Sequence, residues 1–167
     1  LAKILAKEGK LSEAIQQYKL ILSNDKSNPS VHLSLGKLLL EQNKDEEAVT
    51  HLNMAVDLLP NNFQAQIRVA DLYLEKGMLD QSLKFYEVAA SLKPEDVKVR
   101  MQLGKIFSDK NDFDSALIAY ENAVRLDPSD AESQYQLGKI LASTKQYDRA
   151  QLVLEKARSL RAEHAAT

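Results

Sequence analysis

The sequence repeats itself every 34 residues, and this period constrains the fold more than any other feature. A shift by 34 aligns a column of aliphatic residues, Leu35, Val69, Leu103 and Leu137. The next column holds small residues, Gly36, Ala70, Gly104 and Gly138, and prolines close three successive repeats at Pro60, Pro94 and Pro128. A fixed period of this length is typical of a solenoid, in which repeats bury their apolar faces against their neighbours.

We therefore expect one solenoid domain over residues 1–167. It would contain a partial repeat at 1–28, whole repeats at 29–62, 63–96, 97–130 and 131–164, and a tail at 165–167.

Each repeat has the pattern of two helices joined by a short turn. Apolar residues recur at helical spacing in two runs per repeat and never alternate as in a strand. Between the runs stand residues that we expect to take the left-handed backbone conformation, Gly9, Asn43, Gly77, Asn111 and Lys145. We expect the second helices to be capped by Ser12, Glu46, Asp80, Asp114 and Asp148. The closing prolines would end those helices, whereas Pro29, behind Asn28, would begin one.

These columns resemble the tetratricopeptide repeat family, over essentially the whole chain. The resemblance implies an all-α fold, a right-handed superhelical solenoid of antiparallel helix–turn–helix hairpins whose first helices line a concave groove. It also implies that Gly36, Gly104 and Gly138 allow close helix approach, and that Tyr86 and Tyr120 fill the space between repeats. The Trp that the family carries in the first helix is replaced here by His32, Gln66, Arg100 and Gln134, which predicts a more polar contact between repeats.

No residue pattern indicates catalysis, a cofactor or a metal. The repeat accounts for all five glycines, so no phosphate-binding loop remains. The histidines, His32, His51 and His164, are expected to lie apart on solvated helix faces, and acid pairs such as Glu46–Glu47 and Glu95–Asp96 to mark helix starts. The absence of Cys excludes disulfides, thiolate zinc sites and a cysteine nucleophile, and leaves the compartment undecided.

Charge and hydropathy exclude two further classes of partner. The chain has 22 Lys and Arg against 24 Asp and Glu, which gives no electrostatic footprint for nucleic acid. No apolar run approaches the roughly 20 residues of a membrane helix, so we expect no membrane insertion.

The candidate site is the groove that the resemblance implies. An apolar ladder consists of Leu33, Ile67, Met101 and Tyr135, beside a mostly basic column of Lys3, Lys37, Asp71, Lys105 and Lys139. A third column offers hydrogen-bond donors, Ser34, Arg68, Gln102 and Gln136, and Lys98 adds a cation. This pattern predicts a protein or peptide partner with apolar anchors and acidic groups.

Two alternatives to that site stay open. Lys37 with Glu41 and Lys105 with Asp109 stand four residues apart, so each pair could neutralise itself. The convex face or the two ends of the solenoid could instead bind the partner. The residues that tetratricopeptide repeats use to bind chaperone tails, and the asparagine ladder of O-linked N-acetylglucosamine transferases, are both missing.

The leading hypothesis is a noncatalytic scaffold or adaptor that binds a partner segment in the groove. The alternatives are the substrate-recruiting region of a larger enzyme, for example a glycosyltransferase, and a self-assembling structural module. The chain starts at Leu1 rather than Met, so we expect a fragment or a processed form.

Both ends of the predicted solenoid carry apolar residues that no further repeat covers. They are Leu1, Ile4 and Leu5 at one end and Leu152, Val153, Leu154, Ala157 and Leu160 at the other. Ala162 stands where other repeats have Pro, so the last helix should continue through Glu163 and His164. This extension should cover little of the apolar surface at that end. This predicts end-to-end self-association, or further repeats or caps in the natural protein.

Overall fold

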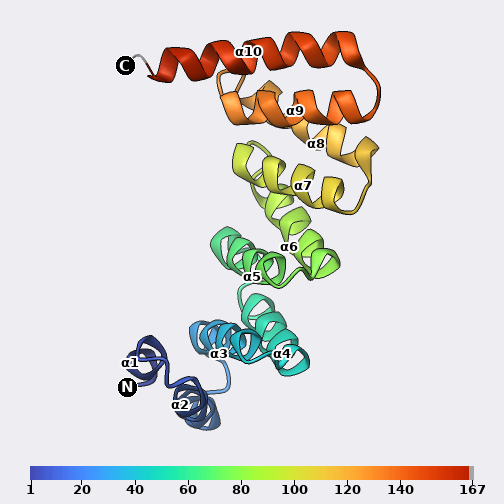
Figure 1. Cartoon of the computed structure of the whole chain (residues 1–167). Coiled ribbons are helices and arrows are strands. Elements are labelled where there is room, and N and C mark those ends of the chain that lie inside the picture. The colour runs from blue at the N-terminus through green and yellow to red at the C-terminus, as the bar shows by residue number, and fades with distance from the viewer. Residues whose placement is uncertain (166–167) are drawn as a thin grey trace. The chain divides into compact units, whose positions relative to one another are not determined.

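The computed structural model describes residues 1–165, and within that range it contains helices and turns and no strand. The all-α, helical-repeat solenoid class is therefore confirmed. The chain forms two compact units, Leu1–Phe85 and the part from Tyr86 onward, and the boundary between them falls inside helix α6. Helices that follow each other in sequence pair into hairpins (Figure 1).

The helices have nearly uniform lengths, apart from the first and the last. The first unit contains α1 (Ala2–Lys7), α2 (Leu11–Asn24), α3 (Pro29–Glu41), α4 (Asp45–Asp57), α5 (Phe63–Glu75) and the first part of α6 (Leu79–Leu92). The second contains the rest of α6, α7 (Val97–Asp109), α8 (Phe113–Leu126), α9 (Ala131–Ser143) and α10 (Tyr147–Ala165).

The turn inside each hairpin has the predicted backbone conformation. Positive φ angles occur at Gly9 (76°), Asn43 (57°), Gly77 (71°), Asn111 (60°) and Lys145 (61°). Gly adopts this conformation without a steric penalty and Asn tolerates it, whereas for Lys145 it carries a local strain. The prediction from the 34-residue period is confirmed at all five positions.

The predicted caps of the second helices were wrong by two residues. The predicted cap residues Ser12, Glu46, Asp80, Asp114 and Asp148 all lie inside the first turn, because helices α2, α4, α6, α8 and α10 begin one residue earlier. Side-chain caps occur instead in a regular column before the first helices, at Asn28, Asn62, Asp96 and Asp130, and before the second helix α8 at Asp112. Each accepts a hydrogen bond from the backbone N–H three residues on, at 2.9–3.2 Å, which satisfies a donor that the helix leaves unpaired.

The glycine column allows the two helices of a hairpin to approach closely, as predicted. A Cβ atom on Gly36 would lie 2.6 Å from Leu52, and one on Gly104 would lie 2.7 Å from the ring of Tyr120. A Cβ atom on Gly138 would lie 2.6 Å from Leu154. The Tyr120 ring is 3% exposed and belongs to the core of the second unit, with Leu137, Ile140 and Leu141. Any side chain at these glycines would have to displace a neighbour that is buried, or in the case of Leu154 half-buried.

The polar column that replaces the family's Trp bonds to the preceding turn. The ring or amide nitrogens of His32, Gln66 and Gln134 lie 2.9–3.0 Å from the backbone oxygens of Lys26, Pro60 and Pro128, respectively. Arg100 donates two hydrogen bonds, at 3.1 and 3.2 Å, to the oxygen of Pro94. Each contact spans six residues and ties the start of a first helix to the turn before it. Because three of these side chains are buried, the contacts satisfy carbonyl groups that water reaches poorly.

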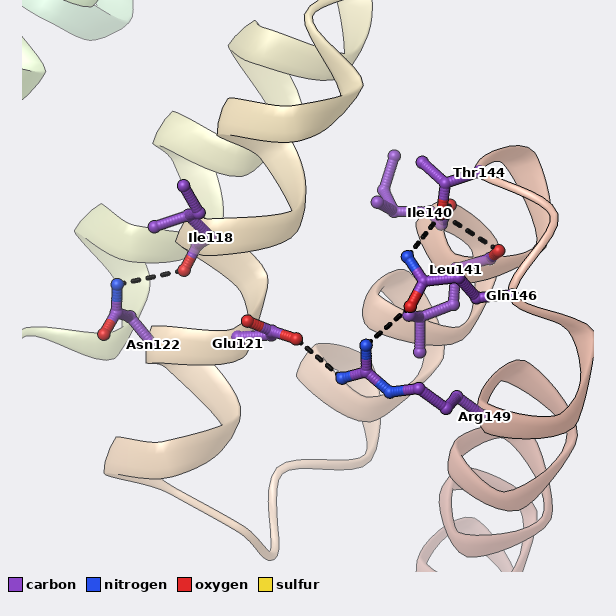
Figure 2. A network of polar contacts seen from close by, with 8 residues as sticks. All are labelled: Ile118, Glu121, Asn122, Ile140, Leu141, Thr144, Gln146 and Arg149. Atoms are coloured by element: carbon purple, nitrogen blue, oxygen red, sulfur yellow. Dashed lines mark hydrogen bonds and ion pairs between the residues drawn. The ribbon is translucent and has the colours of Figure 1, made fainter.

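A polar network joins the turn before α10 to α8 in the second unit (Figure 2). Arg149 donates to Gln146 Oε1 at 2.6 Å and to Glu121 Oε1 at 2.7 Å. Gln146 in turn donates to the hydroxyl of Thr144, at 3.1 Å, at the end of α9. The Arg149 and Glu121 side chains are about half exposed, so we expect the network to order this turn more than it stabilises the fold.

Candidate functional site

A polar hollow lies between the first helices α3 and α5 of the first unit. Its volume is about 350 Å³, and its lining consists of Leu33, Ser34, Lys37, Arg68, Asp71 and Leu72. The helical period places these side chains on the facing sides of α3 and α5, because they recur three or four residues apart. Lys37 and Arg68 are exposed, and Leu33 is half-buried beside them. The hollow therefore combines an apolar surface with two cations and the carboxylate of Asp71.

A second hollow lies between α7 and α9 in the second unit and has a volume of about 440 Å³. Five predicted site residues line it, Met101, Gln102, Lys105, Gln136 and Lys139. Ser108, Asp109, Tyr120 and Glu132 complete the lining. Lys105 and Lys139 are exposed and occupy equivalent positions in consecutive repeats. The two hollows thus have the same place in the repeat, each between consecutive first helices.

Four predicted groove residues line neither hollow. Ile67 is half-buried on α5, Lys3 is exposed on α1, and Lys98 is exposed in the first turn of α7. Tyr135 is 36% exposed on α9 and lies under two cations, with the Arg161 guanidinium 4.7 Å and the Lys139 ammonium 5.7 Å from its ring centroid. Both distances are within the range of cation–π attraction.

Of the two predicted ion pairs within one helix, Lys37–Glu41 forms weakly and Lys105–Asp109 does not form. Lys37 Nζ lies 4.0 Å from Glu41 Oε1, at the limit of an ion pair, and both side chains are largely exposed. Lys105 forms no ion pair with Asp109 or with any other residue of the range 1–165. The Lys105 side chain is thus exposed without a charged partner in the described part of the chain.

Sequence reasoning missed Tyr120 as part of this surface. The tyrosine was predicted only as a space-filling residue between repeats, and most of its side chain has that role. Its contribution to the hollow between α7 and α9 depends on how far the ring extends past Gly104, which no 34-residue column specifies. The only sequence signal is that Tyr, and not Leu, stands opposite a glycine.

A larger hollow lies elsewhere in the second unit, where α6, α7 and α8 meet. It measures about 570 Å³ and is lined mainly by apolar groups, among them Ala90, Leu103, Phe107, Ile118 and Ala119. Ile118 is 61% exposed beside it. The convex face and the ends of the solenoid stay open as alternative sites, and this hollow is a further candidate surface apart from the two described above.

The prediction that the histidines lie apart on solvated faces was wrong for His32 and His51. His32 is 5% exposed, and its Nδ1 lies 2.9 Å from Nδ1 of His51, on the partner helix of the same hairpin. Both belong to the repeat 29–62, in which the antiparallel pairing of α3 and α4 brings them together. Within residues 1–165 no three His, Asp or Glu side chains converge as metal ligands would. The His164 side chain lies outside the described set.

The ends of the repeat array match their predictions only in part. Leu1, Ile4 and Leu152 are exposed, but Ala157 is buried, and Val153, Leu154 and Leu160 are half-buried. Helix α10 does continue through Ala162 to Ala165. The extended end of α10 covers more of α9 than expected, because Arg161 forms an ion pair with Glu132 at 2.9 Å and lies over the Tyr135 ring. No helix within residues 1–165 is long and apolar enough to cross a membrane.

Comparisons with solved structures find the same fold. A crystal structure of MamA matches with a TM-score of 0.80 at 20% identity and covers 100% of this chain and 98% of its own. MamA from Desulfovibrio magneticus RS-1 matches at 22% identity with a TM-score of 0.75, covering 97% of this chain and 92% of its own. YrrB, described as a TPR protein with an unusual peptide-binding site, matches at 21% identity with a TM-score of 0.74, covering 98% and 84%.

Sequence comparison gives the family directly. No curated protein matches the sequence significantly. Models described as "Tetratricopeptide repeat" match residues 5–72 and residues 63–96 and 131–164, and one described as "TPR repeat" matches residues 104–145. Together these matches span most of the chain, and the hairpins, turns and close-packed glycines of the structure agree with them. The chain belongs to the tetratricopeptide repeat family.

Proposed function

We propose that this chain is a noncatalytic protein-binding scaffold that binds a partner segment carrying apolar anchors and acidic groups on its first helices. The observation that carries the proposal is the pair of hollows at equivalent places in the repeat. Each hollow has an apolar residue, Leu33 or Met101, beside an exposed lysine, Lys37 or Lys105. Such a surface suits a segment that alternates apolar and acidic side chains.

Membership of the repeat family supports the same function. Stacked helical hairpins offer extended surfaces built from many equivalent positions, which suits the binding of chain segments better than the enclosure of a small substrate. YrrB, which shares the fold, is described as having a peptide-binding site. A peptide ligand for this chain is our extension of that likeness.

A peptide selection tests the chemistry of the partner. We expect a random peptide library displayed on phage to yield binders enriched in Asp or Glu next to Leu, Ile or Phe. Their affinity should fall as ionic strength rises, because exposed charges are screened over about 8 Å at physiological salt. Selection of mainly basic peptides, or of none, would contradict the proposal.

A pair of charge reversals then tests whether the peptide binds at the two hollows. Lys37→Glu with Lys105→Glu should weaken a selected acidic peptide at least tenfold and leave the thermal midpoint nearly unchanged, because both side chains are exposed. The matched control is Lys7→Glu with Lys156→Glu. It makes the same charge change at exposed positions, one in each unit, that line neither hollow. Equal loss of binding in both double variants would show that only net charge matters.

A further inference from the structure

The hollow between α7 and α9 contains a hydrogen-bond donor that the protein does not use. Tyr120 is 3% exposed, yet it lines this hollow. Its phenol oxygen forms no hydrogen bond with any residue in the range 1–165 and does not belong to the fully enclosed polar atoms. Buried tyrosines usually satisfy their hydroxyl inside the protein, so an unpaired one that opens into a hollow is available to an acceptor from outside the chain.

Acidic groups on both helices of the hollow influence the Tyr120 phenol. Burial raises the pKa of Tyr120 to about 12, and the carboxylates of Asp109 on α7 and Glu132 on α9 contribute to the rise. The phenol oxygen therefore lies in the field of acids from both helices. At neutral pH the phenol is protonated, and it keeps its hydrogen available for an acceptor.

The remaining charges of the hollow favour an anionic acceptor. Both oxygens of Glu132 are occupied, Oε1 by Gln136 Nε2 at 2.7 Å and Oε2 by Arg161 Nη2 at 2.9 Å. Lys105 has no partner in the described part of the chain, and Lys139 only faces the Tyr135 ring. Two cations and a phenol donor therefore stand against the single uncompensated carboxylate of Asp109.

We propose that this hollow is a carboxylate subsite, in which an acidic side chain of the bound segment accepts a hydrogen bond from Tyr120 and pairs with Lys105 and Lys139. The inference rests on the proposed function and names the residues that would recognise the acidic group. The hollow between α3 and α5 provides an internal contrast, because its repeat has Leu52 at the position of Tyr120 and so supplies no phenol. Of the two hollows, only the one between α7 and α9 therefore offers a phenol to a carboxylate.

Nuclear magnetic resonance with glutarate, which carries the carboxylate of a Glu side chain, tests the subsite without any peptide. We expect the ¹³Cζ resonance of Tyr120 to shift on titration with glutarate at constant ionic strength, and not with glutaramide, its neutral analogue. The internal control is Tyr73, whose ring is fully buried and whose hydroxyl lies 3.5 Å from Asn53 Oδ1 and outside both hollows. Its resonance should not move.

Variants separate recognition from packing. Tyr120→Phe should weaken glutarate binding about tenfold, as expected for a hydrogen bond to a charged group, and leave the thermal midpoint unchanged because the lost hydroxyl has no protein partner. Lys105→Met should weaken binding to a similar extent. Tyr73→Phe, the matched control, should bind glutarate as the wild type does.

The outcomes also separate this inference from the proposed function. An unmoved Tyr120 resonance, or equal glutarate affinity of the wild type and Tyr120→Phe, would overturn the subsite, even if acidic peptides bind elsewhere on the first helices. A Tyr120 response to glutarate, together with failure of every acidic peptide to bind, would instead overturn the scaffold proposal and keep the subsite.

Discussion

At the scale of single residues, the position where the family has Trp stabilises the repeat in a different way in this chain. His32, Gln66, Arg100 and Gln134 all bond to the backbone oxygen six residues earlier. A large aromatic ring would stabilise this position by burying apolar area, whereas these side chains stabilise it by satisfying a carbonyl group. His32 alone adds a second polar contact, to His51. The other repeats have no His at the position of His51.

The His32–His51 contact makes the first unit sensitive to acid. The Lys26 carbonyl accepts a hydrogen bond, so Nε2 of His32 carries the hydrogen and Nδ1 of His32 accepts from His51. Burial, followed by the nearby His32 and Lys19, lowers the pKa of His51, which the neighbouring Glu47 opposes. Folding thus favours neutral His51. Its contribution to stability is complete above the unfolded pKa of about 6.5 and falls as the pH drops below that value.

The variant His51→Phe tests this dependence, because Phe85 stands at the same position in the next repeat. We expect the thermal midpoint of the wild type to fall between pH 7.5 and pH 5.5 by more than that of His51→Phe. Calorimetry at both pH values measures the difference. The same fall in both proteins would mean that other groups cause the acid sensitivity.

The histidine pair also marks a limit of what the sequence predicts. The 34-residue period identifies which positions are equivalent, so it predicted the left-handed turns and the close approach at Gly36, Gly104 and Gly138. Contacts inside one hairpin depend on how two helices are aligned and on side-chain rotamers. His32 and His51, and the phenol of Tyr120 in its hollow, both depend on that alignment. Hence most of the predicted groove residues line the two hollows, whereas the unpaired phenol among them was not predicted, and binding at these hollows stays a prediction.

At the scale of helices, the last one differs from the others because it lacks a closing proline. Ala162 stands at the position of Pro60, Pro94 and Pro128, and α10 runs for 19 residues where α8 has 14. The added part of the helix places Arg161 in contact with Glu132 and with the Tyr135 ring. The missing proline therefore decides whether Tyr135, a predicted anchor of the groove, lies under Arg161 as well as under Lys139.

The substitution Ala162→Pro should restore the shorter helix. Proline removes a backbone donor and disfavours helix at the residue before it, so Arg161 should leave Glu132 and Tyr135. We expect a small loss of helical circular dichroism and a changed Tyr135 aromatic resonance. The unfolding free energy should change by less than about 1 kcal/mol, because the Arg161–Glu132 pair is about half exposed. Arg161→Met is the control and should change the Tyr135 resonance alone, whereas an unaltered resonance in Ala162→Pro would refute the role of the extension.

At the scale of the whole chain, stability should be a sum of terms within hairpins and between neighbours. The hairpin α9–α10 supplies Leu137, Ile140, Leu141 and Ala150 to the core of the second unit. Ala116 and Tyr120 of α8 complete that buried cluster, and Met101, Phe107 and Phe113 pack against it. The interface between α8 and α9 is thus apolar, and each buried Leu or Ile contributes about 1.5–3 kcal/mol relative to its exposed state.

Deletion of residues 131–167 removes the stabilisation from the α8–α9 interface. The preceding hairpins keep the contacts that they make among themselves. We expect residues 1–130 to keep the helical circular dichroism per residue of the full chain and to unfold at a lower urea concentration. The slope of the unfolding free energy with urea should also fall, because less surface becomes exposed. Leu141→Ala in the full chain is the control; it should lower the midpoint by weakening the same cluster, at a cost of about 2–5 kcal/mol, with no helix removed. Collapse of residues 1–130 to an unfolded chain would mean that the repeats fold only as one cooperative body, and that the nearest-neighbour description does not hold for this solenoid.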